Sequence, residues 1–314
     1  MPNEMKLHQP WFVAVWPGMG NVALAAGYYL MAKLGMRVFA EFSAKELFDV
    51  EHVEVKNGLI RTGRMPRSRL FIWNDPARVH DIVLLIGEAQ PPLGKYAFCH
   101  KLIEYAQELG VERVFTFAAM ATQMHPEHPS RVFSAATAEE SLDELKRQEL
   151  TLLEDGQIGG LNGVLLGVAA EAGLNGTCLL GEMPHIFAQL PFPKASLAVL
   201  QVFSTMAGIE IDFAELSEQA AAIEQRLGEL LAQVERQMGQ EGPPPEEQFN
   251  PEQYNPEPSD EGRLAPDDER RVEQLFKQAR DDRSKAYELK SELDRLGVFK
   301  DYEDRFLDLF RSTG

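Results

Sequence analysis

The sequence predicts an α/β protein with a mixed, mostly parallel sheet sandwiched by helices, followed by an α-helical C-terminal extension. Two apolar runs, 83–87 and 178–181, each end at an acidic residue, Glu88 or Glu182, and proline follows soon after. Short runs bounded in this way are typical of buried strands, and their alternation with helical stretches favours a parallel sheet. From residue 213 onward the apolar spacing is helical.

The first part of the chain predicts a βαβ unit and a hairpin. A strand over 11–16 leads through a tight turn into a helix over 22–34, which Gly35 ends before a strand over 36–42. Further on, Asn57-Gly58 separates two β-branched segments and is a strong signal for a two-residue hairpin. We therefore expect an antiparallel portion inserted in the parallel sheet.

The middle of the chain continues the alternation of strands and helices. Phe98, Leu102 and Leu109 have helical spacing, and Gly110 ends that helix. A glycine-rich loop over 155–163 precedes another helix, and the domain closes near residue 212. The other expected elements are strands at 70–73, 81–86, 113–117, 132–135, around 152 and ending at 182, a loop over 118–130, and helices within 138–150, over 164–172 and over 195–207.

The C-terminal third predicts a coiled-coil-like helix, a linker and a last helical region. Apolar residues spaced four and three apart form a seam that needs a partner surface. The linker is rich in proline and acidic residues, which favours an extended segment. The expected parts are a core domain over 1–212, the helix over 213–239, the linker over 240–268 and the helical region over 269–314. The seam consists of Leu216, Ala220, Ile223, Leu227, Leu230 and Val234.

The charge of the chain argues against nucleic acid or an anionic membrane as the principal partner. The 314 residues carry a formal net charge of −18, and the pI is near 4.9, so a polyanion would be repelled. Most of the acidity lies in the C-terminal third. The local exception is Arg61, Arg64, Arg67 and Arg69, which we interpret as the solvated rim of a hairpin rather than an anion-docking patch.

Neither a disulfide framework nor a metal site is expected. Cys99 and Cys178 are too few for such a framework, and His125 and His128 lie in a polar loop without a further ligand nearby. The N-terminus lacks the pattern of a signal peptide, and no apolar run is long enough to span a membrane. We therefore expect a cytoplasmic protein.

Two glycine-rich turns could serve a ligand or only the packing of the chain. The motif at 18–23, Gly-Met-Gly-Asn-Val-Ala, fits a dinucleotide fingerprint, with Glu41 in the place of the ribose-binding acid. The hairpin at Asn57-Gly58 takes the place of the next helix and strand of a Rossmann half, so no cofactor is expected. The small residues at 156–163 permit close backbone packing. The same loop also places the N-terminus of the following helix at the sheet edge, where a ligand could bind.

Glu88 and Glu182 are expected on one rim, because ligands of open α/β sheets bind beyond the carboxyl ends of the strands. The two carboxylates could act as general acid and base, or accept hydrogen bonds from a ligand, or cap backbone N–H groups of their own loops. The Gly-x-Ser-x-Gly, His-Glu-x-x-His and Cys-x-x-Cys motifs are absent. No catalytic residue is therefore assigned.

Six segments, in order over roughly two-thirds of the chain, resemble the proteasome assembly chaperone 2 family. They are 17–23 (PGMGNVA), 33–36 (KLGM), 85–91 (LIGEAQP), 158–167 (IGGLNGVLLG), 179–185 (LLGEMPH) and 208–212 (GIEID).

This resemblance implies a fold similar to the purine nucleoside phosphorylase-like α/β architecture, and homo-oligomers built from it. It also implies kinship with non-catalytic helpers that hold proteasome subunits during assembly. Archaeal relatives that dock on the proteasome look as if they use a hydrophobic-Tyr-any C-terminus. This chain departs from that pattern, because it ends in Arg311-Ser312-Thr313-Gly314.

Two functional hypotheses follow. The first is a homo-oligomeric, assembly-chaperone-like interaction protein without turnover, whose partners are its own copies and a client protein. The second is an enzyme or sensor that binds a nucleoside, nucleotide or phosphate in the crevice at the sheet edge. Its candidate ligand-binding residues are Gly18, Gly20, Asn21, Glu88, Gln90, Asn162, Gly163 and Glu182.

Overall fold

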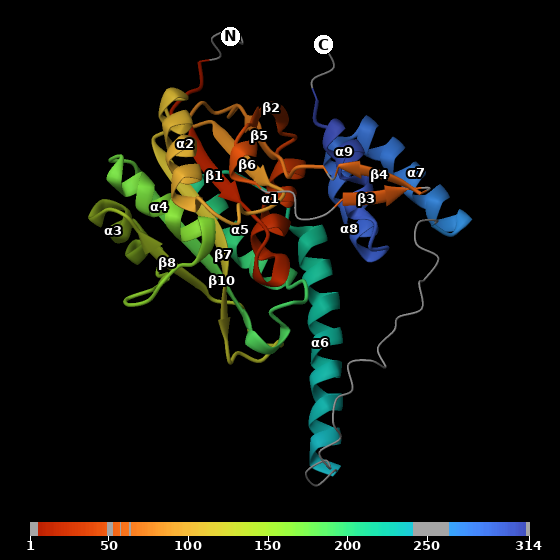
Figure 1. Cartoon of the computed structure of the whole chain (residues 1–314). Coiled ribbons are helices and arrows are strands. Elements are labelled where there is room, and N and C mark those ends of the chain that lie inside the picture. Colours follow the sequence, from red (N-terminus) through yellow and green to blue (C-terminus); the bar gives the residue numbers. More distant parts are fainter. Residues whose placement is uncertain (1–5, 49–52, 57, 63, 241–263, 312–314) are drawn as a thin grey trace.

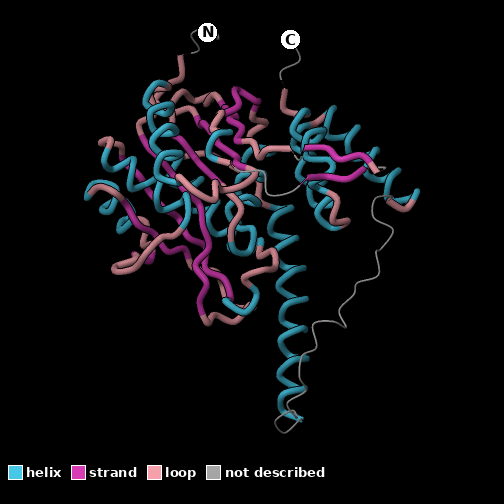
Figure 2. The backbone as a smooth tube through the Cα atoms, viewed as in Figure 1, coloured by secondary structure: helices cyan, strands magenta, loops and turns pink. Residues whose placement is uncertain are grey.

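The computed structural model describes residues 6–48, 53–56, 58–62, 64–240 and 264–311, and its centre is an eight-stranded mixed sheet (Figure 1, Figure 2). The strand order is β2-β5-β6-β1-β7-β10-β8-β9. Four central strands, β6, β1, β7 and β10, run parallel, β5 is antiparallel to both of its neighbours, and β8 is antiparallel to β10 but parallel to β9. The predicted fold class is confirmed. The strands are β1 (Trp11–Val15), β2 (Arg37–Phe42), β5 (Ser68–Trp73), β6 (Ile82–Gly87), β7 (Arg113–Thr122), β8 (Val132–Ala136), β9 (Thr151–Leu152) and β10 (Asn175–Pro184).

Helices cover both faces of the sheet because both faces are apolar. Along β1, Val13 and Val15 belong to one core cluster, and Phe12 and Ala14 belong to the other. The first cluster packs under α1, α5 and the C-terminal helices, and the second packs under α2 and α4. The helices are α1 (Val22–Lys33), α2 (Lys95–Glu108), α3 (Glu139–Arg147), α4 (Gly160–Glu171), α5 (Pro193–Ala207), α6 (Ala214–Gln240), α7 (Pro266–Asp281), α8 (Ala286–Arg295) and α9 (Phe299–Asp308).

In the first βαβ unit, the two strands β1 and β2 are not neighbours in the sheet. Strands β6 and β5 lie between β1 and β2, and β2 pairs antiparallel with β5. The predicted hairpin forms from β3 (Val53–Lys56) and β4 (Leu59–Thr62), but these strands make a separate two-stranded sheet. The antiparallel portion of the main sheet comes from β5 and β8 instead.

Two boundaries near the sheet edge differ from the sequence prediction. Strand β7 continues to Thr122, where a loop over 118–130 was expected, because it pairs with β10 along its whole length. Helix α4 begins at Gly160 rather than at Val164, so the last residues of the glycine-rich loop form its first turn. Because of both differences, a strand and a helix extend further toward the candidate crevice than the sequence predicts.

The C-terminal helices dock on α1 and on the edge strand β2. The Tyr28 hydroxyl donates to Glu303 at 3.1 Å, and the ring of Tyr29 meets that of Tyr287 edge-to-face at 4.6 Å. The Val38 N–H donates to the carbonyl of Phe310 at 2.9 Å. Of the expected linker, residues 241–263 lie outside the described residues, and α7 already begins at Pro266. Among the described residues, no helix is both long and apolar enough to cross a membrane.

Candidate functional site

Glu88 and Glu182 lie at the same edge of the sheet but in separate surroundings. Glu88 follows β6, and Glu182 lies near the end of β10, opposite Met120 of β7. Strands β1 and β7 separate them, which corresponds to about 14 Å at the usual strand spacing. Their side chains also leave opposite faces, because Glu88 follows the alternation of Ile86 and Glu182 follows that of Leu180. The structure does not bring the two carboxylates into one pocket.

Glu88 anchors the arginines that surround the end of β4 and the start of β5. Its buried carboxylate pairs with Arg64 at 2.8 Å and with Arg69 at 3.0 Å, and it accepts the backbone N–H of Arg67 at 3.0 Å. Asp304 of α9 pairs with the same three arginines. The interpretation of this cluster as a solvated rim is wrong for Arg69, which is buried, whereas Arg64 is exposed, and the folded chain supplies counter-charges to both.

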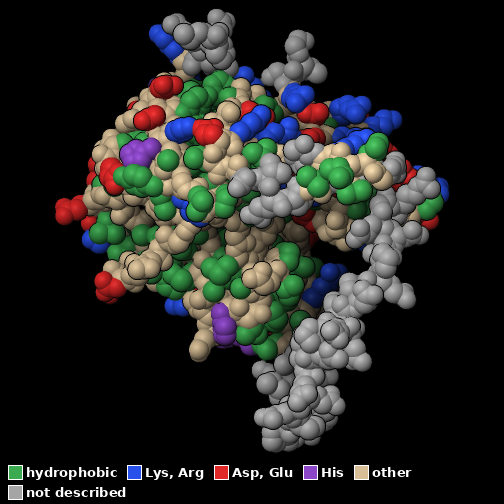
Figure 3. Space-filling view, viewed as in Figure 1, with side chains coloured by type: hydrophobic (Ala, Val, Ile, Leu, Met, Phe, Trp, Pro, Cys, Tyr) green, Lys and Arg blue, Asp and Glu red, His purple; other side chains and the backbone are tan. Residues whose placement is uncertain are grey.

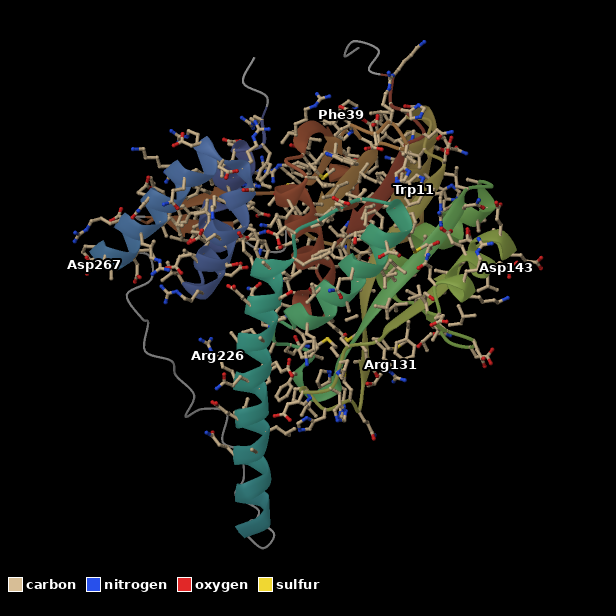
Figure 4. All side chains as sticks on the ribbon, turned by 180° about the vertical axis from the view of Figure 1, so that it is seen from behind. Trp11, Phe39, Arg131, Asp143, Arg226 and Asp267 are labelled. Atoms are coloured by element: carbon tan, nitrogen blue, oxygen red, sulfur yellow. The ribbon has the colours of Figure 1, made fainter. Side chains whose placement is uncertain are left out.

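Glu182 is held by a bidentate pair with Arg131. The Nε and a terminal nitrogen of Arg131 each donate to the carboxylate at 2.7 Å, and the Thr122 hydroxyl donates at 2.8 Å. The hydrogen bonds from Arg131 lower the pKa of Glu182 from its usual value of 4.5. Figure 4 shows Arg131 near the end of the strands, and the pair lines an open pocket with Met124, Pro129 and other residues of the β7–β8 loop. Glu182 is therefore ionised at neutral pH and unsuited to proton donation.

A cavity of about 420 Å³ lies between α1 and α4 at the same edge. Three of the candidate residues, Gly18, Gln90 and Asn162, line it. Gln90 connects its two walls, since its Nε2 donates to the carbonyl of Pro17 at 3.1 Å and its Oε1 accepts the N–H of Leu161 at 3.0 Å. The other lining residues are Met19, Ala23, Ala118, Ala119, Met120, Ala121, Gln157, Ile158, Gly159, Gly160 and Leu180.

The remaining candidate glycines, Gly20 and Gly163, are closely packed, and neither of them lines this cavity. A Cβ on Gly163 would lie 1.9 Å from the carbonyl oxygen of Ile158. Gly20 has φ +60° and exchanges backbone hydrogen bonds with the loop after β10, donating to Ala188 and accepting from Phe192. Gly20 and Asn21 line a second cavity, bounded by α6 and α8.

The predicted seam on α6 is largely occupied within the chain. Leu216 and Leu227 are buried, and Ile223 is half-buried against the same core, where α5 supplies part of the partner surface. Leu230 is 42% exposed, and the C-terminal part of α6 extends beyond the sheet (Figure 1). Val234 belongs to the helix, but its side chain lies outside the described residues.

Three residues that take part at the edge carried no usable sequence signal. From the sequence, Thr122 is expected in the loop over 118–130, and Arg131 directly follows that loop. Asp304 lies in the charged C-terminal region, where nothing relates it to the sheet edge. Their contacts are distant in sequence, and Arg69 and Asp304 lie 235 positions apart. Among the residues that the structure describes, no group of His, Cys, Asp and Glu side chains could hold a metal ion. Cys99 and Cys178 are buried and unpaired, and burial raises the thiol pKa of each to about 12.

The sheet and its covering helices define an α/β protein. At one edge of the sheet its two acidic residues form ion pairs, and a small cavity lined by uncharged residues lies beside them. A model of the PAC2 family matches residues 12–231, and the chain belongs to this family. The match ends within α6, so α7, α8 and α9 lie outside it.

Similar proteins come from archaea and bacteria. An uncharacterised protein of Methanocaldococcus jannaschii is 31% identical, over 74% of this chain and 87% of its own length. Pyrococcus furiosus PbaB, described as an archaeal proteasome activator, is 26% identical with a TM-score of 0.62, over 74% of this chain and 96% of its own. A PAC2 family protein from Streptomyces avermitilis is 25% identical with a TM-score of 0.59, over 70% and 95% of the two chains.

Proposed function

We propose that this protein is a cytoplasmic, assembly-chaperone-like protein that binds other proteins as a homo-oligomer and without turnover. Its similarity to an archaeal proteasome activator supports a protein as the partner. The ion pairs of Glu88 and Glu182 support the absence of turnover, because each carboxylate already has its hydrogen-bond donors inside the chain.

The observation that carries this proposal is the exposed apolar face of the β3–β4 hairpin. Val55 and Ile60 are paired across the two strands and are 67% and 73% exposed, and Val53 is exposed on the same face. Figure 3 shows hydrophobic side chains gathered over this region. A two-stranded ribbon is marginally stable alone, and clustered exposed apolar side chains are typical of surfaces that bind proteins. We assign this face to the client protein.

A different surface is assigned to self-association. Leu230 is exposed in the second half of α6, and Leu231 beside it is only partly buried. A helix that presents apolar side chains at seam spacing can bury them against the same helix of a second copy. The two surfaces lie on separate elements, so each can be tested without changing the other.

The test is affinity purification of the tagged full chain from its native cells. Val55→Lys with Ile60→Lys places two charges on the hairpin face, and Val79→Lys, at an exposed valine of the β5–β6 loop, is the matched control. We expect proteins to be recovered with the unchanged chain and the control, and to fall about tenfold or more with the hairpin variant. Recovery of the same proteins with all three chains, or of none with the unchanged chain, contradicts the proposal.

A further inference from the structure

The second cavity, bounded by α6 and α8, has a volume of about 460 Å³ and lies where the C-terminal helices meet the family domain. Each of the two helices turns one face toward this space, because its lining residues are three and four positions apart. They include Ala222, Ile223 and Arg226 of α6, and Lys290, Ser291 and Asp294 of α8. The Tyr287 hydroxyl of α8 donates to Gln219 of α6 and joins the two walls. One wall of the cavity thus lies outside the matched family range.

Part of the cavity wall is apolar. Pro191 and Phe192, in the segment that leads into α5, line the cavity together with Ile223 of α6. Ala25 of α1 and Ala222 of α6 also line it, and their small side chains leave the space open. An apolar molecule can therefore bury part of its surface here.

Arg226 gives the cavity a positive charge that no other side chain compensates. In the part of the chain that the structure describes, Arg226 has neither an ion pair nor a hydrogen bond, and Figure 4 shows it on the side of α6 that faces the C-terminal helices. The other cations of the lining are paired. Lys290 is buried and pairs with Asp294 at 2.5 Å. Arg295 pairs with Glu292 at 2.8 Å.

One free guanidinium beside an apolar wall favours a carboxylate as the ligand group. A guanidinium donates two parallel hydrogen bonds to a carboxylate, and the single charge of each is then matched. A phosphate monoester carries about −1.5 to −2 charges at pH 7, and Asp294 on the same cavity would repel the excess. The volume of about 460 Å³ is within the range of small-molecule pockets.

We propose that this cavity binds a small amphipathic carboxylate, with one carboxyl group on an apolar skeleton. The carboxylate accepts two hydrogen bonds from Arg226, and the skeleton packs against Pro191 and Ile223. Because α8 forms one wall, the bound molecule fastens the C-terminal helices to the family domain and slows hydrogen exchange in α8.

The test is a ligand-observed NMR titration of the full chain with 4-phenylbutyrate, 4-phenylbutyramide and acetate. The amide has the same skeleton without the charge, and acetate has the charge without the skeleton. Ala222→Phe fills the cavity from an exposed position of α6. Ala221→Phe, at the neighbouring exposed position that does not line the cavity, is the matched control. Arg226→Gln removes the charge and keeps a polar side chain.

We expect 4-phenylbutyrate to bind with a dissociation constant of about 1 mM or lower, and the amide and acetate to bind about tenfold more weakly or worse. Ala222→Phe should abolish this binding, and Ala221→Phe should leave it unchanged. Arg226→Gln should weaken 4-phenylbutyrate about tenfold, so that it binds no better than the amide. Hydrogen exchange in α8 should become slower when 4-phenylbutyrate is bound to the unchanged chain.

No binding of 4-phenylbutyrate up to about 10 mM overturns the proposal, and so does equal binding of the carboxylate and the amide by the unchanged chain. Equal binding of 4-phenylbutyrate by the unchanged chain and Ala222→Phe also overturns it, because the carboxylate then binds elsewhere. The same conclusion follows if the carboxylate binds and exchange in α8 does not change.

Discussion

Arg69 of β5 donates to Asp304 of α9 at 2.6 Å and pairs with Glu88 at 3.0 Å on its other side. Arg69 is nearly buried, whereas Asp304 is half-exposed. One arginine thus joins the carboxyl end of β6 to the last helix of the chain. The C-terminal helices, which lie outside the matched family range, are fastened to the family domain at the edge that carries the candidate residues.

Asp304→Ala should loosen α9 from the sheet. The substitution removes the acceptor that Arg64, Arg67 and Arg69 share, and Glu88 alone then offsets their charge. Because Asp304 is half-exposed, we expect a loss of only about 1–2 kcal/mol in the free energy of unfolding. Hydrogen exchange should become faster in α9. Asp308→Ala is the control, since Asp308 pairs only with Arg311 among the described residues, and equal exchange in both variants would refute this role.

Glu182→Gln should cost stability at neutral pH and very little in acid. Its pKa is lowered by Arg131, so the folded state holds the ionised form more tightly than the unfolded chain does. That contribution is complete above the unfolded value near 4.5 and is lost as pH falls through the lower folded pKa. We expect about 1–3 kcal/mol at pH 7 by urea unfolding, decreasing as the pH falls below the unfolded pKa. Glu127→Gln, at an exposed acid of the same loop, is the control and should leave the free energy of unfolding at pH 7 unchanged.

Gly163→Ala should destabilise the fold at a residue that does not itself line the cavity. The new Cβ would meet the carbonyl of Ile158, a backbone atom that cannot move aside by a rotamer change. We expect a loss of about 1–3 kcal/mol by chemical denaturation. Gly167→Ala, on the same helix and free of neighbours, should be neutral or slightly stabilising. Similar values for the two substitutions would mean that α4 does not pack closely on Ile158.

Local signals predicted much of the fold. Gly35 and Gly110 adopt positive φ directly after α1 and α2, and Asn57-Gly58 lies between the two strands of the hairpin, although Asn57 is outside the described residues. The position of β2 beside β5 could not be predicted in this way. That pairing depends on which strand edges remain free once β6 pairs with β1, and sequence spacing does not record this.

The sequence predicted where the candidate residues lie, but it did not predict which side chains they contact. Strand ends rich in Gly, acid and Pro placed Glu88 and Glu182 at the sheet edge, but their arginine partners come from other strands and loops. Gln90 was named from a motif, whereas its role in joining Pro17 to Leu161 depends on three segments that meet only in the fold.

Leu230→Lys should weaken self-association. A lysine at position 230 of α6 would place a charge in the apolar contact assigned to a second copy, while the fold should persist because Leu230 is 42% exposed. Sedimentation velocity near 10 µM should show an oligomer for the unchanged chain and a dissociation constant about tenfold higher or more for the variant. Ala221→Lys, at an exposed position nearer the start of α6, is the matched control and should leave the oligomer intact. A monomer for the unchanged chain, or the same oligomer for Leu230→Lys, would exclude this part of α6 as the contact.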